Sequence, residues 1–268
     1  MLDSGGPKVP VLMYHGVSKT AERDKRTRST NPAYCVSLQA FSEQMNWLAE
    51  NRYPTFSLQS LLEPQCLHHS KAVVITFDDG WLNNYTDAFP ILKERGLSAT
   101  VFVVTDFIGR SGYMNWNQLK EMSRGGVSIQ SHTVNHRPLD GLNKEEIRHE
   151  LVSSREAIED HLGTPVHFLS LPHGMANNEV LAIAGEAGYK GICNSEPGYT
   201  HTYGPLPLFR RINVSDRYGI NIFVKIVQRD QTIVLTLIGS KKMKNLLKEV
   251  IGYSAYRKLY RLRYQIRD

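Results

Sequence analysis

Six short apolar runs of strand length recur along this chain, and segments with helical periodicity fill most of the intervals between them. The runs are 9–14, 72–77, 99–104, 127–130, 166–171 and 189–193. Continuous apolar runs of this length are typical of strands buried on both faces, and strands that alternate with helices form a parallel sheet. The sequence therefore predicts an α/β fold with parallel strands and outer helices, either as a barrel or as an open doubly wound sheet.

Two helices carry clear start or stop signals. Asn143 is a favourable N-cap and Gly163 a favourable stop, and the residues between them form an apolar stripe, namely Ile147, Leu151, Ile158 and Leu162. Ser37 is a second N-cap candidate, followed by an apolar face at Phe41, Met45 and Leu48. The polar segment 18–35 is expected to be a loop over one end of the sheet.

The positive charge of the chain is concentrated at its C-terminus. The whole chain of 268 residues has a formal net charge of +6, and residues 240–268 alone contain nine basic and two acidic residues. We therefore expect a main domain over residues 1–230 and a basic amphipathic C-terminal extension over residues 231–268. The 41% hydrophobic content is sufficient for a globular core.

The composition of this basic extension suggests a membrane as its partner. A basic amphipathic segment can lie on an anionic membrane, although a terminal helix packed on the main domain is an equal alternative. No recognised nucleic-acid motif accompanies the charge, so nucleic acid is not an expected partner. The N-terminal residues lack a secretory signal, and we expect a cytoplasmic protein, at the inner face of the membrane if the extension binds it. Three scattered cysteines indicate neither a disulfide framework nor a cysteine-based zinc site.

Polar residues follow four of the predicted strands. His15 follows the first run, Asp78 and Asp79 the second, His132 the fourth, and Pro172-His173-Gly174 the fifth. Functional residues of parallel α/β folds gather at the carboxyl ends of the strands. These side chains are therefore expected to meet at one end of the sheet.

The pair Asp78-Asp79 and the stretch "SHTVNH" together predict a metal site. Two adjacent buried carboxylates repel each other unless a cation lies nearby, and Gly80 allows the chain to turn there. His132 and His136 are four residues apart, which alone is more often a surface feature than a metal site. Two histidines and one carboxylate, however, are a common catalytic zinc set with an open position for water. The alternative is that one acid caps the following helix and the other faces solvent.

"TFDDG" followed by "SHTVNH" resembles the first two signature motifs of the polysaccharide deacetylases, the NodB-homology or family-four carbohydrate esterases. "VPVLMYHGV", "ATVFVV" and "AGYKGI" also resemble this family, in particular the branch that acts on poly-N-acetylglucosamine. The resemblance covers about residues 9–215. It implies a distorted (β/α) barrel and a hydrolase that removes acetyl groups from an N-acetylated sugar, as a polysaccharide or as a lipid-linked or nucleotide-linked precursor.

The resemblance also implies roles for individual residues. Asp78 corresponds to the general base, and Asp79, His132 and His136 correspond to the ligands of a divalent metal. Zinc suits these ligands best, and nickel or cobalt would also suit them. The backbone N–H of His173, in "LPHG", corresponds to the donor that stabilises the oxyanion.

Two departures from the family pattern affect the remaining roles. The family's Arg-x-Pro-Tyr motif reads Ser170-Leu171-Pro172-His173, so the arginine and tyrosine side chains that contact substrate there are both missing. A separate arginine orients the base in this family, and "LFRRINV" resembles the corresponding segment of the poly-N-acetylglucosamine branch, which indicates Arg211, with Arg210 as its rival. The late Leu-x-His motif has no counterpart, and His15 in "MYH" resembles the histidine that protonates the leaving amine in the biofilm branch. These departures keep open a non-catalytic carbohydrate-binding protein on the same fold.

Overall fold

The computed structural model describes residues 9–18, 34–63, 71–199, 206–216 and 218–251. The chain divides into two compact units, Met1–Arg229 and Asp230–Asp268. Most of the polar segment predicted as a loop, 18–35, lies outside the described residues. Among the helices described, none combines the length and the apolar character needed to cross a membrane.

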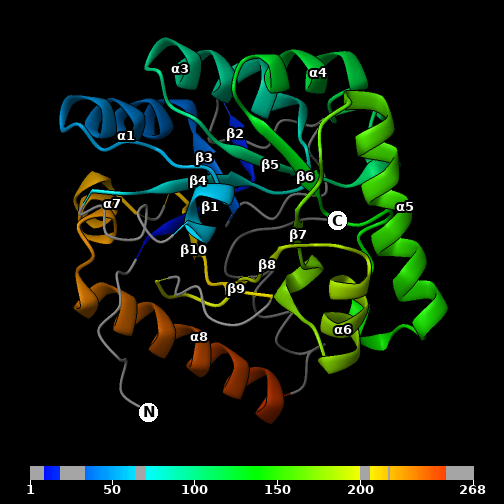
Figure 1. Ribbon diagram of the computed structural model, residues 1–268. Helices are drawn as coiled ribbons and strands as arrows, with labels where there is room; N and C mark the ends of the chain where they lie inside the picture. Colours follow the sequence, from blue (N-terminus) through cyan, green and yellow to red (C-terminus); the bar gives the residue numbers. More distant parts are fainter. Residues whose placement is uncertain (1–8, 19–33, 64–70, 200–205, 217, 252–268) are drawn as a thin grey trace. The chain divides into compact units, whose positions relative to one another are not determined.

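The first unit is built on one parallel sheet of eight strands in the order β10-β1-β4-β5-β6-β7-β8-β9. The strands are β1 (Val11–Tyr14), β4 (Val74–Phe77), β5 (Thr100–Val103), β6 (Ser128–Ser131), β7 (Phe168–Ser170), β8 (Gly191–Cys193), β9 (Leu208–Phe209) and β10 (Ile212–Asn213). Each predicted apolar run contains or overlaps one of these strands. The sheet curls into a half-barrel, which confirms the predicted distorted (β/α) barrel and excludes the doubly wound alternative (Figure 1).

Helices surround the curled sheet (Figure 1). They are α1 (Leu38–Glu50), α3 (Phe89–Glu94), α4 (Trp116–Arg124), α5 (Lys144–Leu162), α6 (Asn178–Glu186) and α7 (Ile220–Val227), with short helical turns η3 (Gln59–Leu62), η4 (Asn84–Ala88), η5 (Thr105–Phe107), η6 (Leu139–Gly141) and η7 (Pro172–Gly174). A separate pair of strands, β2 (Gly16–Ser18) and β3 (Cys35–Ser37), runs parallel beside them. The second unit contains α8 (Gln231–Ile251).

The predicted helix signals are confirmed where they were strongest. The Asn143 side chain accepts a hydrogen bond from Glu146 N at 3.0 Å, and the Glu146 side chain accepts one from Asn143 N at 3.1 Å. This reciprocal capping box begins α5, and Gly163 ends the helix with a left-handed φ of 67°. Ser37 caps α1 by accepting a hydrogen bond from Ala40 N, without a reciprocal bond.

The interior of the half-barrel changes from apolar to polar along the strands. A buried apolar cluster includes Val74, Phe168 and Phe209. Two residues further along each of these segments are Thr76, Ser170 and Arg211, and Arg211 donates hydrogen bonds to the hydroxyls of the other two. Because side chains two residues apart point to the same face of a strand, each segment contributes to both layers. The apolar layer therefore forms a floor beneath a polar layer at the carboxyl ends of the strands.

Candidate functional site

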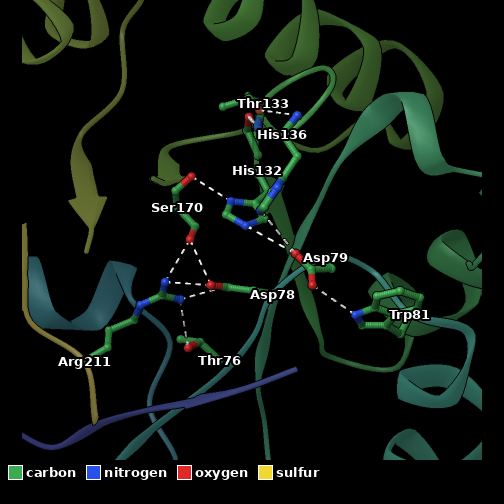
Figure 2. A network of polar contacts seen from close by, with 10 residues as sticks. Thr76, Asp78, Asp79, Trp81, His132, Thr133, His136, Ser170 and Arg211 are labelled. Atoms are coloured by element: carbon green, nitrogen blue, oxygen red, sulfur yellow. Dashed lines mark hydrogen bonds and ion pairs between the residues drawn. The ribbon is translucent and has the colours of Figure 1, made fainter. Parts of the chain in front are cut away.

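The backbone turns sharply where β4 ends, between Asp78 and Gly80. Asp78 N donates to Tyr14 O at 3.0 Å and continues the strand pairing, whereas Asp79 has a φ of 76° and Gly80 a φ of 74°. Positive φ is uncommon for a residue other than glycine. The turn directs the two adjacent carboxylates towards different partners, as Figure 2 shows.

Asp78 forms a buried ion pair with Arg211. The two guanidinium nitrogens Nη1 and Nη2 donate to the two carboxylate oxygens, each at 2.7 Å. Arg211 is fully buried and Asp78 is 3% exposed. Burial by itself would raise the pKa of Asp78, but the charge and hydrogen bonds of Arg211 hold that pKa below its ordinary value. Asp78 is therefore an ionised carboxylate in a dry environment.

Arg211 uses its remaining donors within the same layer. Nε donates to Asn194 O at 2.9 Å, Nη1 to Thr76 Oγ1 at 3.3 Å, and Nη2 to Ser170 Oγ at 2.8 Å. The guanidinium carbon also lies 5.5 Å from the ring centroid of Phe102. A buried ion pair needs such complete hydrogen bonding to offset its desolvation. Arg210, the neighbouring arginine, is exposed, so it is Arg211 that pairs with Asp78.

Ser170 occupies the position at which the family motif has its arginine. Its hydroxyl donates to Asp78 Oδ2 at 3.2 Å and accepts from Arg211. A short side chain at this position leaves room for the guanidinium that arrives after β9. The sequence shows that this arginine is missing, but nothing in it predicts that Ser170 holds Asp78 together with Arg211.

Asp79, His132 and His136 bring three possible metal ligands together. Asp79 Oδ1 lies 3.5 Å from Nε2 of His132 and 3.5 Å from Nε2 of His136, and all three atoms lie within 4.8 Å of one another. Zinc bonds of about 2.0–2.2 Å in a tetrahedron separate neighbouring ligand atoms by roughly 3.3–3.6 Å. Each nitrogen therefore lies from the Asp79 oxygen at the spacing expected of two ligands of one such cation.

Outer partners hold two of these ligands in orientations suited to a metal. His132 Nδ1 lies 2.8 Å from the backbone oxygen of Ser170, so Nδ1 carries a proton, and Nε2 presents its lone pair in the neutral form of the ring. The indole Nε1 of Trp81 donates to Asp79 Oδ2 at 3.0 Å, which leaves Oδ1 facing the histidines (Figure 2). Hydrogen bonds of this kind are characteristic of metal sites, where they fix the ligands.

The segment between the two histidines is a tight loop. Oε2 of Glu150, on α5, accepts hydrogen bonds from Val134 N at 2.9 Å and from Asn135 N at 3.1 Å. Glu150 is only 1% exposed. Its signal in the sequence was an acidic residue beside the apolar stripe of a predicted helix, which was not recognised.

Strained backbone is concentrated at this site. Six residues other than glycine have positive φ in the described part of the chain, and four of them belong here, namely Asp79, Thr133, His136 and His173. Such conformations cost roughly 1–3 kcal/mol each and persist where the surrounding structure enforces them, often at functional sites. The strain supports a functional interpretation of this cluster over a purely structural one.

The electrostatics favour the metal-binding forms of Asp79 and His136, whereas for His132 the effect of burial is outweighed by Asp78 and Asp79, which raise its pKa. Burial would raise the pKa of Asp79, but the hydrogen-bonding contact with His132 and the charges of nearby histidines hold it well below its ordinary range. Burial and the charge of His132 lower the pKa of His136 to about 4. An ionised carboxylate and a neutral imidazole are the protonation states in which these groups bind metals.

His173 lies beside the metal cluster. Its ring is 5.0 Å from that of His136, and its backbone has a φ of 58°. Gly174, also at positive φ, packs so closely that a Cβ would approach Ser195 Oγ to 2.7 Å. In the described part of the chain the His173 N–H has no hydrogen-bond partner, so it is available to a ligand.

His15 lies at the carboxyl end of β1 within electrostatic reach of both aspartates. Burial lowers its pKa, and Asp79 and Asp78 act in the opposite direction. Its backbone oxygen accepts from Asn84 Nδ2 at 2.6 Å, whereas its buried Nδ1 has no partner among the described residues. The structure thus gathers every predicted site residue at one end of the half-barrel, namely His15, Asp78, Asp79, His132, His136, His173 and Arg211.

Known proteins resemble this chain in both sequence and structure. The family model for polysaccharide deacetylases matches residues 68–192. The Bacillus subtilis protein YxkH, which carries this family's name, is 34% identical over 211 residues, 78% of this chain and 72% of that protein. The poly-β-1,6-N-acetyl-D-glucosamine N-deacetylase of Staphylococcus aureus is 26% identical over 173 residues, 59% of this chain and 60% of that protein.

Solved structures give the same picture. The Streptococcus pyogenes deacetylase PplD, in complex with acetate, superposes with a TM-score of 0.75 at 26% identity, covering 83% of this chain and 99% of that one. IcaB from Ammonifex degensii superposes with a TM-score of 0.67 at 21% identity, covering 83% of this chain and 98% of that one. The shared structure therefore includes nearly the whole of both solved chains.

Proposed function

We propose that this chain, which belongs to the polysaccharide deacetylase family, is a metal-dependent hydrolase that removes the acetyl group from an N-acetylated sugar. The observation that supports this most directly is that two adjacent carboxylates at the end of β4 have different partners. Asp79 joins His132 and His136 in a metal-sized cluster, while Asp78 is held ionised beside it by Arg211. Ligation and proton transfer are the two tasks that metal-dependent hydrolysis of an amide requires.

The donor set fits a divalent cation, with zinc as the proposed metal. A divalent cation held by Asp79, His132 and His136 would lower the pKa of a water molecule towards neutrality and polarise the acetyl carbonyl. Nickel or cobalt would suit the same two nitrogens and one oxygen. The metal identity is part of the proposal, and metal analysis of the purified protein tests it.

The side chains around the cluster divide the proton transfers between them. The Asp78 carboxylate, oriented by Arg211, accepts the proton of the attacking water. The His173 N–H donates to the oxygen that becomes negative when the carbonyl carbon is attacked. His15 donates a proton to the sugar nitrogen as the C–N bond breaks, so that a neutral amine and acetate leave.

A substrate containing N-acetylglucosamine is the proposed class, because the Staphylococcus aureus relative is named for poly-β-1,6-N-acetyl-D-glucosamine. Polysaccharide, nucleotide-linked and lipid-linked forms are to be distinguished by incubating each with the metal-loaded protein. Mass spectrometry then reports the loss of acetyl mass, and a coupled assay reports acetate.

The decisive variant is Asp78→Asn, with Asp160→Asn on the exposed face of α5 as the matched control. We expect Asp78→Asn to retain bound metal and lose turnover, because the amide cannot accept the proton. Asp160→Asn should behave as the unmodified protein. Full activity in Asp78→Asn would remove the assigned base, and the absence of acetate release with every substrate would favour the carbohydrate-binding alternative.

We also propose that residues 231–268 form a separate extension that contacts anionic membranes. α8 contains four lysines, Lys241, Lys242, Lys244 and Lys248, against one acid, Glu249. Sedimentation with phosphatidylserine vesicles tests this on the full chain and on a variant with the four lysines replaced by glutamine. We expect salt-sensitive binding that the variant loses; equal sedimentation of both proteins would contradict the proposal.

A further inference from the structure

Trp81 contacts the candidate metal ligand Asp79 directly. Its indole Nε1 donates a hydrogen bond to Asp79 Oδ2 at 3.0 Å, and the residue is only 3% exposed. This bond joins two residues that lie on either side of Gly80, at the turn where the chain leaves β4. It therefore fixes one carboxylate oxygen at the point where the backbone is strained.

The segment around Tyr113 holds the indole ring in place. The rings of Trp81 and Tyr113 stack with centroids 4.4 Å apart and planes at 22°. The two backbones also pair, since Leu82 N donates to Gly112 O at 2.8 Å and Met114 N donates to Gly80 O at 3.1 Å. Contacts of the ring and of the backbone on both sides leave the indole little freedom to turn its N–H away from Asp79.

The same aromatic contacts continue to a second ligand. Phe107 lies 4.9 Å from the Tyr113 ring and 6.5 Å from the His136 ring, measured between centroids. A series of three aromatic side chains, Trp81, Tyr113 and Phe107, thus connects the carboxylate of Asp79 with the imidazole of His136. Rigid packing behind both ligands preserves their separation before a metal arrives, which is how preorganised sites gain affinity.

An aspartate without such a donor has two ways to bind a cation. Its terminal torsion is broad, so either oxygen, or both, can face the metal. Binding through both oxygens would occupy a coordination position that the attacking water or the acetyl oxygen needs. A donor that occupies Oδ2 removes this option, because only Oδ1 then points at His132 and His136.

We propose that Trp81 is a positioning residue that keeps Asp79 a ligand through one oxygen and so preserves open coordination positions on the metal. The inference rests on the proposed function, because it concerns the same metal site. It predicts a specific consequence of removing the indole N–H, namely weaker binding together with an altered coordination geometry.

The test uses the full chain with Trp81→Phe, which retains an aromatic ring and removes the N–H. Trp116→Phe is the matched control, because Trp116 stacks on His161 at 3.9 Å on the outer helices. Zinc affinity is measured by competition with a chelator, and the visible absorption spectrum of the cobalt-loaded protein reports the coordination geometry. Thermal unfolding of the metal-free proteins reports the fold.

We expect Trp81→Phe to bind zinc about 10–100-fold more weakly than the unmodified chain, the range typical for loss of an outer hydrogen bond to a ligand. Its cobalt spectrum should lose intensity as the ligand number rises, while Trp116→Phe changes neither property. If Trp81→Phe binds zinc equally well with an unchanged spectrum, the inference is wrong. If the unmodified chain binds no metal, the proposed function itself fails.

A second variant covers the case in which Trp81→Phe does not fold. Tyr113→Leu removes the ring that supports the indole and leaves the N–H in place. Weakened zinc binding with a changed cobalt spectrum in this variant supports the positioning role. Zinc affinity and a spectrum equal to those of the unmodified chain would contradict it.

Discussion

Asp78 and Asp79 are adjacent in the chain, yet the structure places their carboxylates in opposite electrostatic settings. Asp78 faces the interior of the half-barrel, where Arg211 provides a permanent cation through two contacts of 2.7 Å. Asp79 faces the rim, where its Oδ1 meets two imidazole nitrogens at 3.5 Å. Asp78 therefore has its counterion, Arg211, within the chain. The proposed counterion of Asp79 is a metal ion from solution.

Burial differs in the same sense. The side chains of Arg211 and Asp78 are 0% and 4% exposed, whereas those of Asp79 and His136 are 15% and 25% exposed. A permanent ion pair is strongest where water is excluded, and an exchangeable ion needs a path to solvent. One turn of backbone at the end of β4 thus separates a closed ion pair from a cluster in which Asp79 and His136 are partly exposed, although the His132 side chain is only 3% exposed.

The largest expected effect comes from removing the built-in cation. Arg211→Met should destabilise the metal-free protein by about 3–5 kcal/mol, because it leaves Asp78 buried and unpaired. Asp79→Asn should cost only about 1 kcal/mol, since the amide oxygen can still accept from Trp81. Urea denaturation of both variants in the presence of a chelator measures the difference, and equal losses would break the contrast between the two acids.

The pH dependence of the free energy of unfolding tests the contrast between Asp78 and Asp79 further. Arg211 holds the pKa of Asp78 below its ordinary value, so the stabilisation from the pair is complete above that ordinary value. It is lost only as the pH falls through the lower pKa of the folded state. In Arg211→Met the buried carboxylate should instead take up a proton at a higher pH than an ordinary aspartate does.

Zinc should give the next largest effect, and only through the Asp79 cluster. At a free concentration 100 times the dissociation constant, a ligand that binds only the folded state stabilises it by about 2.7 kcal/mol. Thermal unfolding with and without zinc should show this gain in the unmodified chain and in Asp78→Asn. Asp79→Asn should show little gain; an undiminished gain would place the metal elsewhere.

Substitution of Glu150 should disturb the proposed metal ligands through the loop that carries His136. Glu150→Ala removes the acceptor of two partly buried N–H groups in the loop that carries His136, at an expected cost of about 1–3 kcal/mol. Glu150→Gln retains an acceptor oxygen and should recover part of both the stability and the zinc affinity. If neither variant alters zinc affinity, the loop does not depend on Glu150 for its conformation.

The sequence predicted the membership of this site because its residues carry distinctive chemistry and follow strands. In a parallel sheet the carboxyl ends of neighbouring strands meet, so His15, Asp78 and His132 could be expected together without coordinates. The six apolar runs predicted a parallel α/β sheet, and the family resemblance, not the runs, implied its barrel form. Strands β9 and β10, with two residues each, are too short for any periodicity to reveal.

The supporting residues were not predictable in this way. Ser170 contacts Asp78 across 92 positions of sequence, and serine is a common residue with no distinctive pattern. The role of Trp81 depends on the direction of its indole N–H, and the role of Glu150 depends on the position of its carboxylate Oε2. Both groups contact backbone turns that contain residues at positive φ. Spacing alone also could not distinguish a helical turn from a loop between His132 and His136. The loop is stabilised by hydrogen bonds that its N–H groups donate to Glu150 on α5, and spacing does not reveal these bonds.

The smallest expected effect is that of Ser170→Ala, and it best distinguishes the environment of Asp78 from that of Asp79. Ser170 reaches both environments, but by different groups: its hydroxyl contacts Asp78 and Arg211, and its backbone oxygen accepts from His132. Ser170→Ala removes only the hydroxyl, so it should cost about 1 kcal/mol of stability and reduce turnover. Zinc affinity should not change, because the backbone oxygen that orients His132 remains. A loss of zinc affinity in Ser170→Ala would show that the ion pair and the metal cluster are coupled through this layer, and that the division between them is less complete than their geometry indicates.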